Sequence, residues 1–190
     1  MPLPPTLLKG SCLCSKTSFT STKLPLCLTH CHCIPCRKLS GGPFTTWADF
    51  PSNAISWTPP AAATAAPIAT STTSSTSGNP EAPACGNGMP TLRRSSKIAT
   101  RGFCESCGST VSMQYDMDPD VLGVAVGLID EDCHGDVGAV LEILPQKHIF
   151  LKDKARWFKV EKGSVGEASE WEGFSGDWER KVGMKGHGTV

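Results

Sequence analysis

The stretch Cys31-His-Cys33-Ile-Pro-Cys36, flanked along the chain by Cys12-Leu-Cys14 and Cys104-Glu-Ser-Cys107, decides the fold. These first, middle and last clusters contain seven of the ten cysteines, grouped as two, three and two. Four thiolates close a zinc ion off from other ligands, whereas three leave it one open coordination position. The grouping therefore predicts two zinc ions per chain, one in a closed site and one in an open site.

The spacing within each cluster suits metal binding. Side chains at positions i and i+2 of a strand point to one face, so the two cysteines of the first cluster, and Cys31 with Cys33, can present their sulfurs together. Cys33 and Cys36, like the two cysteines of the last cluster, have the Cys-x-x-Cys spacing of a tight metal-binding turn. Pro35 presets one backbone angle of its turn, and we expect a positive φ at Gly108. Pairing the first and last clusters gives the closed site, which leaves the middle cluster with three sulfurs.

The fourth position of the middle site can take water, a substrate thiolate or a protein side chain. A histidine there would close the site as three cysteines and one histidine. We expect His30 and His32 to point to the opposite face of the strand from the cysteines. His148, beside the apolar pair Ile149 and Phe150, is the better distant candidate, although such a histidine is more often packed or hydrogen-bonded.

Composition favours a soluble, cytoplasmic protein of one domain. The 190 residues include 18 lysines and arginines and 18 aspartates and glutamates, a balance that attracts neither nucleic acid nor an anionic membrane. No secretory signal is expected at the N-terminus, and the apolar run at 121–129 is too short to cross a bilayer. In a reducing compartment, clustered cysteines indicate metal binding or catalysis; a disulfide framework remains the alternative for an exported chain.

The chain divides at a low-complexity segment, about 59–92, that is rich in Ala, Ser, Thr, Pro and Gly. We expect a disordered insertion within one domain spanning 7–160, followed by an irregular C-terminal extension at 161–190. A linker between two domains is the alternative, but the first and last clusters lie on opposite sides of the segment and each needs a partner pair. Cys85 is expected to be a free thiol, and the sequence assigns no role to Cys27 or Cys133.

Outside this insertion the patterns favour strands. Segments 17–22, 44–50, 97–103, 110–115 and 121–129 are rich in β-branched, aromatic or apolar residues. Sustained helical periodicity is absent, and 36–40 is expected to form only a short turn. The prediction is a mainly β domain.

Three cysteine motifs in this order resemble those of the glutathione-dependent formaldehyde-activating enzyme and centromere protein V family, whose shared unit is the GFA domain. The resemblance covers roughly residues 7 to 160. Its elements are Gly10-Ser-Cys-Leu-Cys14, Cys31-His-Cys-Ile-Pro-Cys-Arg-Lys38, Gly102-Phe-Cys-Glu-Ser-Cys-Gly-Ser109, Val124-Ala-Val-Gly127, His148-Ile-Phe150 and Trp157-Phe158.

The resemblance implies a β-tent, a small zinc-binding fold of several short antiparallel sheets. It implies a structural zinc held by Cys12, Cys14, Cys104 and Cys107, and an active-site zinc held by Cys31, Cys33 and Cys36. The implied activity is that of a carbon–sulfur lyase or synthase acting on a glutathione-type thiol and a small aldehyde such as formaldehyde.

Two departures from the family pattern bear on this reading. Ser15 follows the first cluster where the family usually has glycine, and the long insertion follows the region of Trp57, where it can reshape the substrate cleft. Two other functions stay open. One is a non-catalytic, zinc-stabilised interaction module, and the other is a thiol-based redox or zinc-buffering protein.

Overall fold

The described residues form a small sheet and a large sheet. The computed structural model describes residues 6–58, 88–131, 136–160 and 169–176. The small sheet is antiparallel in the order β1-β2-β5, and the large sheet has the order β11-β10-β3-β4-β9-β8-β7-β6. The small sheet comprises β1 (Leu8–Ser11), β2 (Ser18–Ser21) and β5 (Ile55–Thr58).

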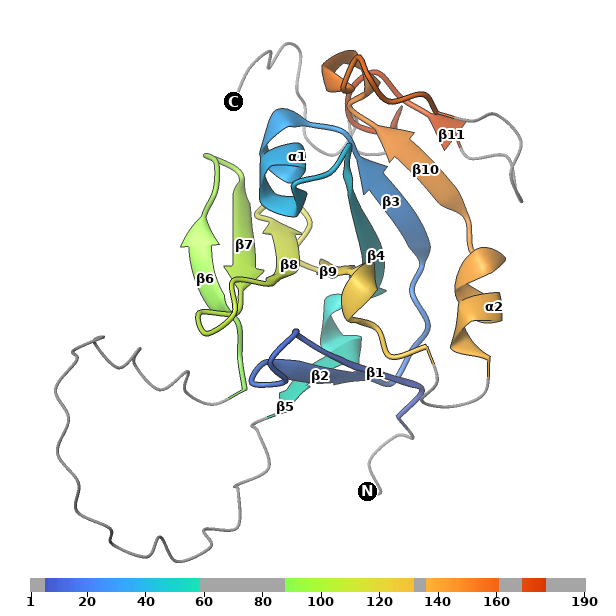
Figure 1. Cartoon of the computed structure of the whole chain (residues 1–190). Helices are drawn as coiled ribbons and strands as arrows, with labels where there is room; N and C mark the ends of the chain where they lie inside the picture. Colours follow the sequence, from blue (N-terminus) through green and yellow to red (C-terminus); the bar gives the residue numbers. More distant parts are fainter. Residues whose placement is uncertain (1–5, 59–87, 132–135, 161–168, 177–190) are drawn as a thin grey trace, which may run out of the picture.

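The large sheet contains eight strands. They are β3 (Cys27–Cys31), β4 (Thr45–Pro51), β6 (Thr91–Arg94), β7 (Ala99–Phe103), β8 (Thr110–Tyr115), β9 (Val121–Ala125), β10 (Gln146–Ile149) and β11 (Ser169–Glu170). Its pairings are antiparallel except those of β10, which runs parallel to both β3 and β11. Figure 1 shows β6 to β8 on one side and β10 with β11 on the other.

The helical elements are short. They are α1 (Ile34–Ser40), α2 (Val137–Glu142) and the 3-10 turns η1 (Ser52–Ala54), η2 (Val126–Leu128) and η3 (Leu151–Asp153). In Figure 1, α1 lies between the two sides of the large sheet, while α2 lies below β10. Among the described residues, none of the helices is long and apolar enough to cross a membrane.

The prediction of a mainly β protein is confirmed, with several differences in detail. The predicted fold has several short antiparallel sheets, whereas the described residues form two sheets, one of them large. Parallel pairing occurs at β10, because the connection through α2 brings the chain back beside β3. The expected strand at 121–129 ends at Ala125, where the chain turns into η2. The expected turn at 36–40 is the greater part of α1. The helix α2 was not expected, since six residues are too few to show helical periodicity.

Several sequence predictions fall wholly or partly on undescribed residues. Residues 59–87 of the predicted insertion lie outside the described residues, as do Cys85 and Cys133, whereas β6 begins within the predicted range at Thr91. Of the C-terminal segment 161–190, only 169–176 are described, and β11 there pairs with β10.

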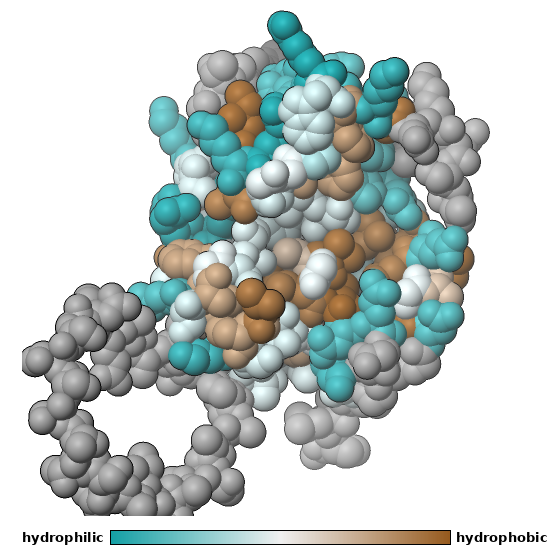
Figure 2. Space-filling model, in the orientation of Figure 1, coloured by the Kyte–Doolittle hydropathy of each residue, from teal (hydrophilic) through white to brown (hydrophobic). Residues whose placement is uncertain are grey.

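An apolar core joins the two sheets. Phe19 of β2 meets Phe50 of β4 edge-on at 6.5 Å between ring centroids, and Trp57 of β5 at 5.9 Å. The same cluster includes Leu8, Leu28, Ala48, Val124, Ile129, Val137 and Leu141. Figure 2 shows hydrophobic residues gathered in the lower half of this face, where the small sheet meets the large one. This core holds in place the loops that carry the cysteines.

We expect Gly10→Ala to destabilise the protein by about 3 kcal/mol or more, because the closest approach at this position is to backbone. A Cβ at Gly10 would lie 2.2 Å from the Leu128 carbonyl oxygen and 2.6 Å from the Phe19 ring. Gly127→Ala is the matched control, since a Cβ there meets nothing within 4 Å. Urea unfolding of both variants checks this, and equal midpoints would contradict the close approach.

Candidate metal centres

The first and last clusters come together at the end of the small sheet. Cys12 and Cys14 lie in the turn after β1, and Cys104 and Cys107 lie in the loop between β7 and β8. Their four Sγ atoms all lie within 4.8 Å of one another, with Cys12–Cys14 at 3.6 Å and Cys14–Cys104 at 3.7 Å. Tetrahedral zinc with Zn–S bonds near 2.3 Å requires sulfurs roughly 3.8 Å apart. This four-cysteine cluster therefore fits a metal ion such as zinc.

Local hydrogen bonds hold this cluster in shape. The Thr17 backbone N–H donates to the Cys12 Sγ at 3.3 Å, and the Cys107 Sγ lies 3.2 Å from the Ser109 Oγ. The Gly108 N–H donates to the Cys104 carbonyl at 2.8 Å, and Gly108 has a φ of 75°, so the predicted positive φ is confirmed. The first two cysteines are brought together by a turn and not, as predicted, by strand alternation.

The middle cluster lies where β3 meets α1. Cys31 is the last residue of β3, Cys33 is the N-cap of α1, and Cys36 lies in the first turn of that helix, after Pro35. The three Sγ atoms lie within 4.8 Å of one another, with Cys31–Cys33 at 3.4 Å. Cys31 and Cys36 are fully buried, and Cys33 is half-buried. Three thiols at this spacing also suit a metal ion.

A buried arginine compensates the charge of the middle cluster. Arg101 of β7 is 8% exposed, and its Nη2 donates to the Cys36 Sγ at 3.6 Å. Hydrogen bonds from Cys31 and Cys33, reinforced by the Arg101 guanidinium, lower the pKa of the Cys36 thiol well below its usual range. A dication bound by three thiolates would carry one net negative charge, which the Arg101 guanidinium would neutralise inside the protein.

We expect Arg101→Leu to weaken zinc retention by the middle cluster about ten- to a hundredfold, as is typical when a partner of a metal ligand is removed. Competition with a chromogenic chelator measures this, and zinc held by the four-cysteine cluster serves as the internal reference. Arg94→Leu is the matched control, because Arg94 pairs with Asp116 at the surface and its side chain is 52% exposed. Equal chelator sensitivity of the two variants would contradict this role.

The histidine considered as a fourth ligand lies elsewhere. His148 stacks on His30 with ring centroids 4.6 Å apart, and its Nδ1 lies 2.9 Å from the His32 Nε2. Residues next to each other on a strand point to opposite faces, so His148 and His30 face away from the cysteine-bearing side. The expected orientation of His30 is confirmed. Burial lowers the pKa of all three rings, that of His32 to about 4, so they are neutral at neutral pH.

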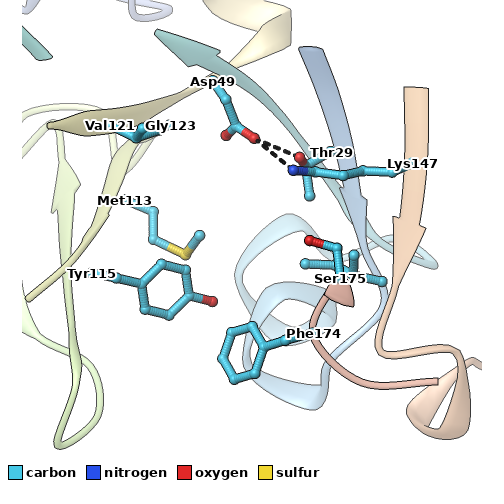
Figure 3. A pocket seen from close by; sticks show the side chains of 10 residues that line it. Thr29, Asp49, Met113, Tyr115, Val121, Gly123, Lys147, Phe174 and Ser175 are labelled. Carbon is cyan, nitrogen blue, oxygen red and sulfur yellow. Dashed lines mark hydrogen bonds and ion pairs between the residues drawn. The ribbon is translucent and has the colours of Figure 1, made fainter. Parts of the chain in front are cut away.

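Over the described parts of the chain, no fourth cysteine, histidine, aspartate or glutamate joins the three sulfurs of the middle cluster. A small pocket lies on the same face of the sheet and is lined by residues of five strands, β3, β4, β8, β9 and β10, together with Phe174 and Ser175 (Figure 3). Met113, Tyr115 and Ile149 line this pocket and also pack in the apolar cluster that contains Cys31 and Cys36.

Sequence reasoning missed the pocket. One signal was present in the expected strand 44–50, where the inward-pointing series Thr45, Trp47, Asp49 ends on a charged residue. A carboxylate on the buried face of a strand indicates a partner or a function. The partner, Lys147, lies about a hundred residues further along the chain, so only the folded structure could supply it.

Fold and clusters together define a class: a mainly β protein with a four-cysteine and a three-cysteine cluster, each able to bind a metal ion. Residues 7–97 match the model of the family described as glutathione-dependent formaldehyde-activating enzyme. This is the family that the cysteine motifs resemble. The match ends before Cys104, so it does not include Cys104 and Cys107. The fold brings these two cysteines next to Cys12 and Cys14.

No curated protein matches this chain. Among solved structures, the chain is similar to the crystal structure of a Rhodobacter sphaeroides protein from a structural genomics programme. The two share 18% sequence identity and a TM-score of 0.43, over 67% of this chain and 91% of that one.

Proposed function

We propose that this protein is a zinc-dependent carbon–sulfur lyase or synthase acting on a glutathione-type thiol and a small aldehyde such as formaldehyde. The single observation that carries the proposal is the cluster of Cys31, Cys33 and Cys36, which gathers three sulfurs, without a fourth described ligand, beside a pocket. The family match, over residues 7–97, points to the same thiol and aldehyde.

The two clusters have different roles under this proposal. Cys12, Cys14, Cys104 and Cys107 hold a structural zinc that ties the turn after β1 to the β7–β8 loop within a GFA-type domain spanning 7–160. Cys31, Cys33 and Cys36 hold a second zinc at the active site. The use of clustered cysteines as metal ligands would suit a reducing, cytoplasmic location.

The reaction is the reversible addition of a thiol to an aldehyde. A carbon–sulfur bond forms between the thiol sulfur and the carbonyl carbon, and the thiol proton ends on the carbonyl oxygen, which gives an adduct like S-hydroxymethylglutathione. Bound zinc favours the thiolate form of a substrate whose free thiol has a pKa of about 8.5.

The chain's own residues would prepare the site for this chemistry. Arg101 balances the charge of the buried thiolates, and the half-buried Cys33 marks the side from which a substrate sulfur can approach. Tyr115 and Ile149 pack against the cysteines and also line the pocket, so they would help to keep water from the reacting groups.

Exchange measurements near equilibrium test the proposal, because thiols also add to formaldehyde without a catalyst. Two-dimensional exchange NMR would follow the interconversion of glutathione and its hydroxymethyl adduct. We expect a rate that rises linearly with protein concentration and saturates with glutathione. A rate unchanged by zinc-loaded protein would contradict catalysis.

A non-catalytic, zinc-stabilised interaction module is the second candidate. The complete burial of Cys31 and Cys36 favours it, because a purely structural site needs no access for substrate. This function predicts two zinc ions per chain, no acceleration of exchange, and no change in the metal's spectroscopic environment when glutathione is added to cobalt-substituted protein.

A further inference from the structure

The pocket beside the middle cluster contains a charge pair. The Lys147 Nζ of β10 lies 3.6 Å from the Asp49 Oδ2 of β4, and their side chains are only 21% and 16% exposed. Thr29 donates its hydroxyl to the same carboxylate oxygen at 2.6 Å, and Cys27 donates its thiol to it at 3.4 Å. Figure 3 shows Asp49, Thr29 and Lys147 together on one side of the pocket, with Tyr115 and Phe174 across from them.

The two charges are near each other but not in close contact. A charge-assisted hydrogen bond between an ammonium and a carboxylate is normally about 2.7–2.9 Å long. At 3.6 Å, the Lys147 ammonium has room to turn its donors to a second acceptor. Burial of both charges without a tight hydrogen bond contributes little to stability, since desolvation offsets the attraction. The pair is therefore better suited to binding than to holding the fold.

The register of the sheet places this pair close to the cysteines. Thr29 pairs with Lys147, and Cys31 pairs with Ile149, in the parallel ladder between β3 and β10. Residues two apart on a strand share a face and lie roughly 7 Å apart along it. A small molecule that spans two residue positions can therefore reach from the Lys147 row to the Cys31 row.

We propose that the pocket binds the zwitterionic α-amino-acid end of a γ-glutamyl thiol, with Lys147 donating to its α-carboxylate and Asp49 accepting from its α-ammonium. This inference rests on the proposed function, because it takes the thiol of the same molecule to the middle cluster. It goes further by assigning the recognition of one end of the substrate to two residues.

Charge and size both favour a zwitterion. An isolated anion would bring its charge against Asp49, and an isolated cation would bring its charge against Lys147, at a cost that is high in a buried site. A zwitterion gives each residue an opposite partner and leaves the net charge unchanged. The cavity volume is about 40 Å³, room for about three water molecules and hence for a head group of similar size.

The C-terminal part of the described chain closes the pocket. Phe174 packs edge-on against Tyr115 at 5.6 Å and against Phe150 at 4.7 Å, and Ser175 lines the pocket beside it. The Gly173 carbonyl accepts the Phe150 N–H at 3.0 Å, which fixes this segment over the sheet. Exclusion of water by these rings strengthens each charged hydrogen bond inside.

Altering the ligand and the protein together tests the proposal. The full-length, zinc-loaded protein is titrated calorimetrically with glutathione, with glutaryl-cysteinylglycine, which lacks the α-ammonium, and with 4-aminobutanoyl-cysteinylglycine, which lacks the α-carboxylate. We expect each analogue to bind the wild type about ten- to a hundredfold more weakly than glutathione. Lys147→Gln should weaken the binding of glutathione by the same factor but leave the affinity for the analogue without an α-carboxylate unchanged. Asp49→Asn should also weaken the binding of glutathione, but leave the affinity for the analogue without an α-ammonium unchanged.

Three controls keep the result unambiguous. Lys147→Arg should recover part of the affinity for glutathione, and Asp116→Asn, at an exposed carboxylate paired with Arg94, should change nothing. Thermal midpoints and zinc content exclude misfolding of the pocket variants. If the pocket variants lose affinity equally for all three thiols, or lose none, while exchange catalysis persists, the recognition by Asp49 and Lys147 is overturned and the proposed function stands. Absence of glutathione binding and of catalysis in the wild type would overturn both this inference and the proposed function.

Discussion

Replacing Cys104 with serine is expected to unfold the protein or leave it aggregated. Cys104 is fully buried and its Sγ lies 3.7 Å from that of Cys14, so the substitution removes a ligand from the centre of the four-cysteine cluster. Structural zinc contributes apparent free energies of about 10–16 kcal/mol in small zinc-dependent domains, comparable to the whole stability of a folded domain. We therefore expect the free energy of unfolding to fall by at least about 4 kcal/mol. Circular dichroism, urea unfolding and zinc content per chain would measure it.

Cys27→Ser is the matched control for this prediction. Cys27 lies outside both clusters and donates a hydrogen bond to Asp49, which a serine hydroxyl can also donate. The control should keep two zinc ions per chain and a wild-type unfolding midpoint. A Cys104→Ser protein with unchanged midpoint and zinc content would contradict the structural role of the cluster.

Replacing Cys36 with serine is expected to lower zinc content from two ions per chain to one and to reduce thiol–aldehyde exchange to the uncatalysed rate. The fold should persist, because the middle cluster joins β3 to the directly following helix α1 and does not connect distant parts of the chain. Loss of the thiolate that faces Arg101 should lower the free energy of unfolding by about 1–3 kcal/mol, the range for a buried group left without its partner.

Unfolding midpoints and exchange NMR on the same samples separate these effects. If Cys36→Ser unfolds as completely as Cys104→Ser, the division into a structural and a reactive site is wrong. If Cys36→Ser loses one zinc but exchanges at the wild-type rate, the second zinc does not catalyse. Cys27→Ser again provides the reference for zinc content and for the unfolding midpoint.

Local spacing predicted the cysteine groups well because metal sites need few residues in a defined order. The positive φ at Gly108 followed from its place after the Cys-x-x-Cys turn, and the structure has it at 75°. Ser15, noted from the sequence as a departure from glycine, has a φ of 58°. A glycine at that position would adopt this left-handed conformation without the strain that serine bears.

Other features could not be read from local patterns. The parallel pairing of β10 with β3 joins segments more than a hundred residues apart, and short strands carry no signal for their partner. The turn that brings Cys12 and Cys14 together replaces the strand expected there, because the backbone folds back to pair Cys12 with Thr17. Trp47, fully buried against the middle cluster, was not distinguished from the other tryptophans.

By itself, the sequence determined which seven cysteines gather into clusters able to bind metal ions, how they divide into four and three, and that the fold is mainly β. Those properties depend on residue type and short spacing. Only the tertiary structure decided that Arg101 faces Cys36, that Gly10 has no room for a side chain, and that Asp49 and Lys147 meet beside the open cluster. Each of these contacts joins segments far apart in the chain, and only the packing of the whole structure brings such segments together.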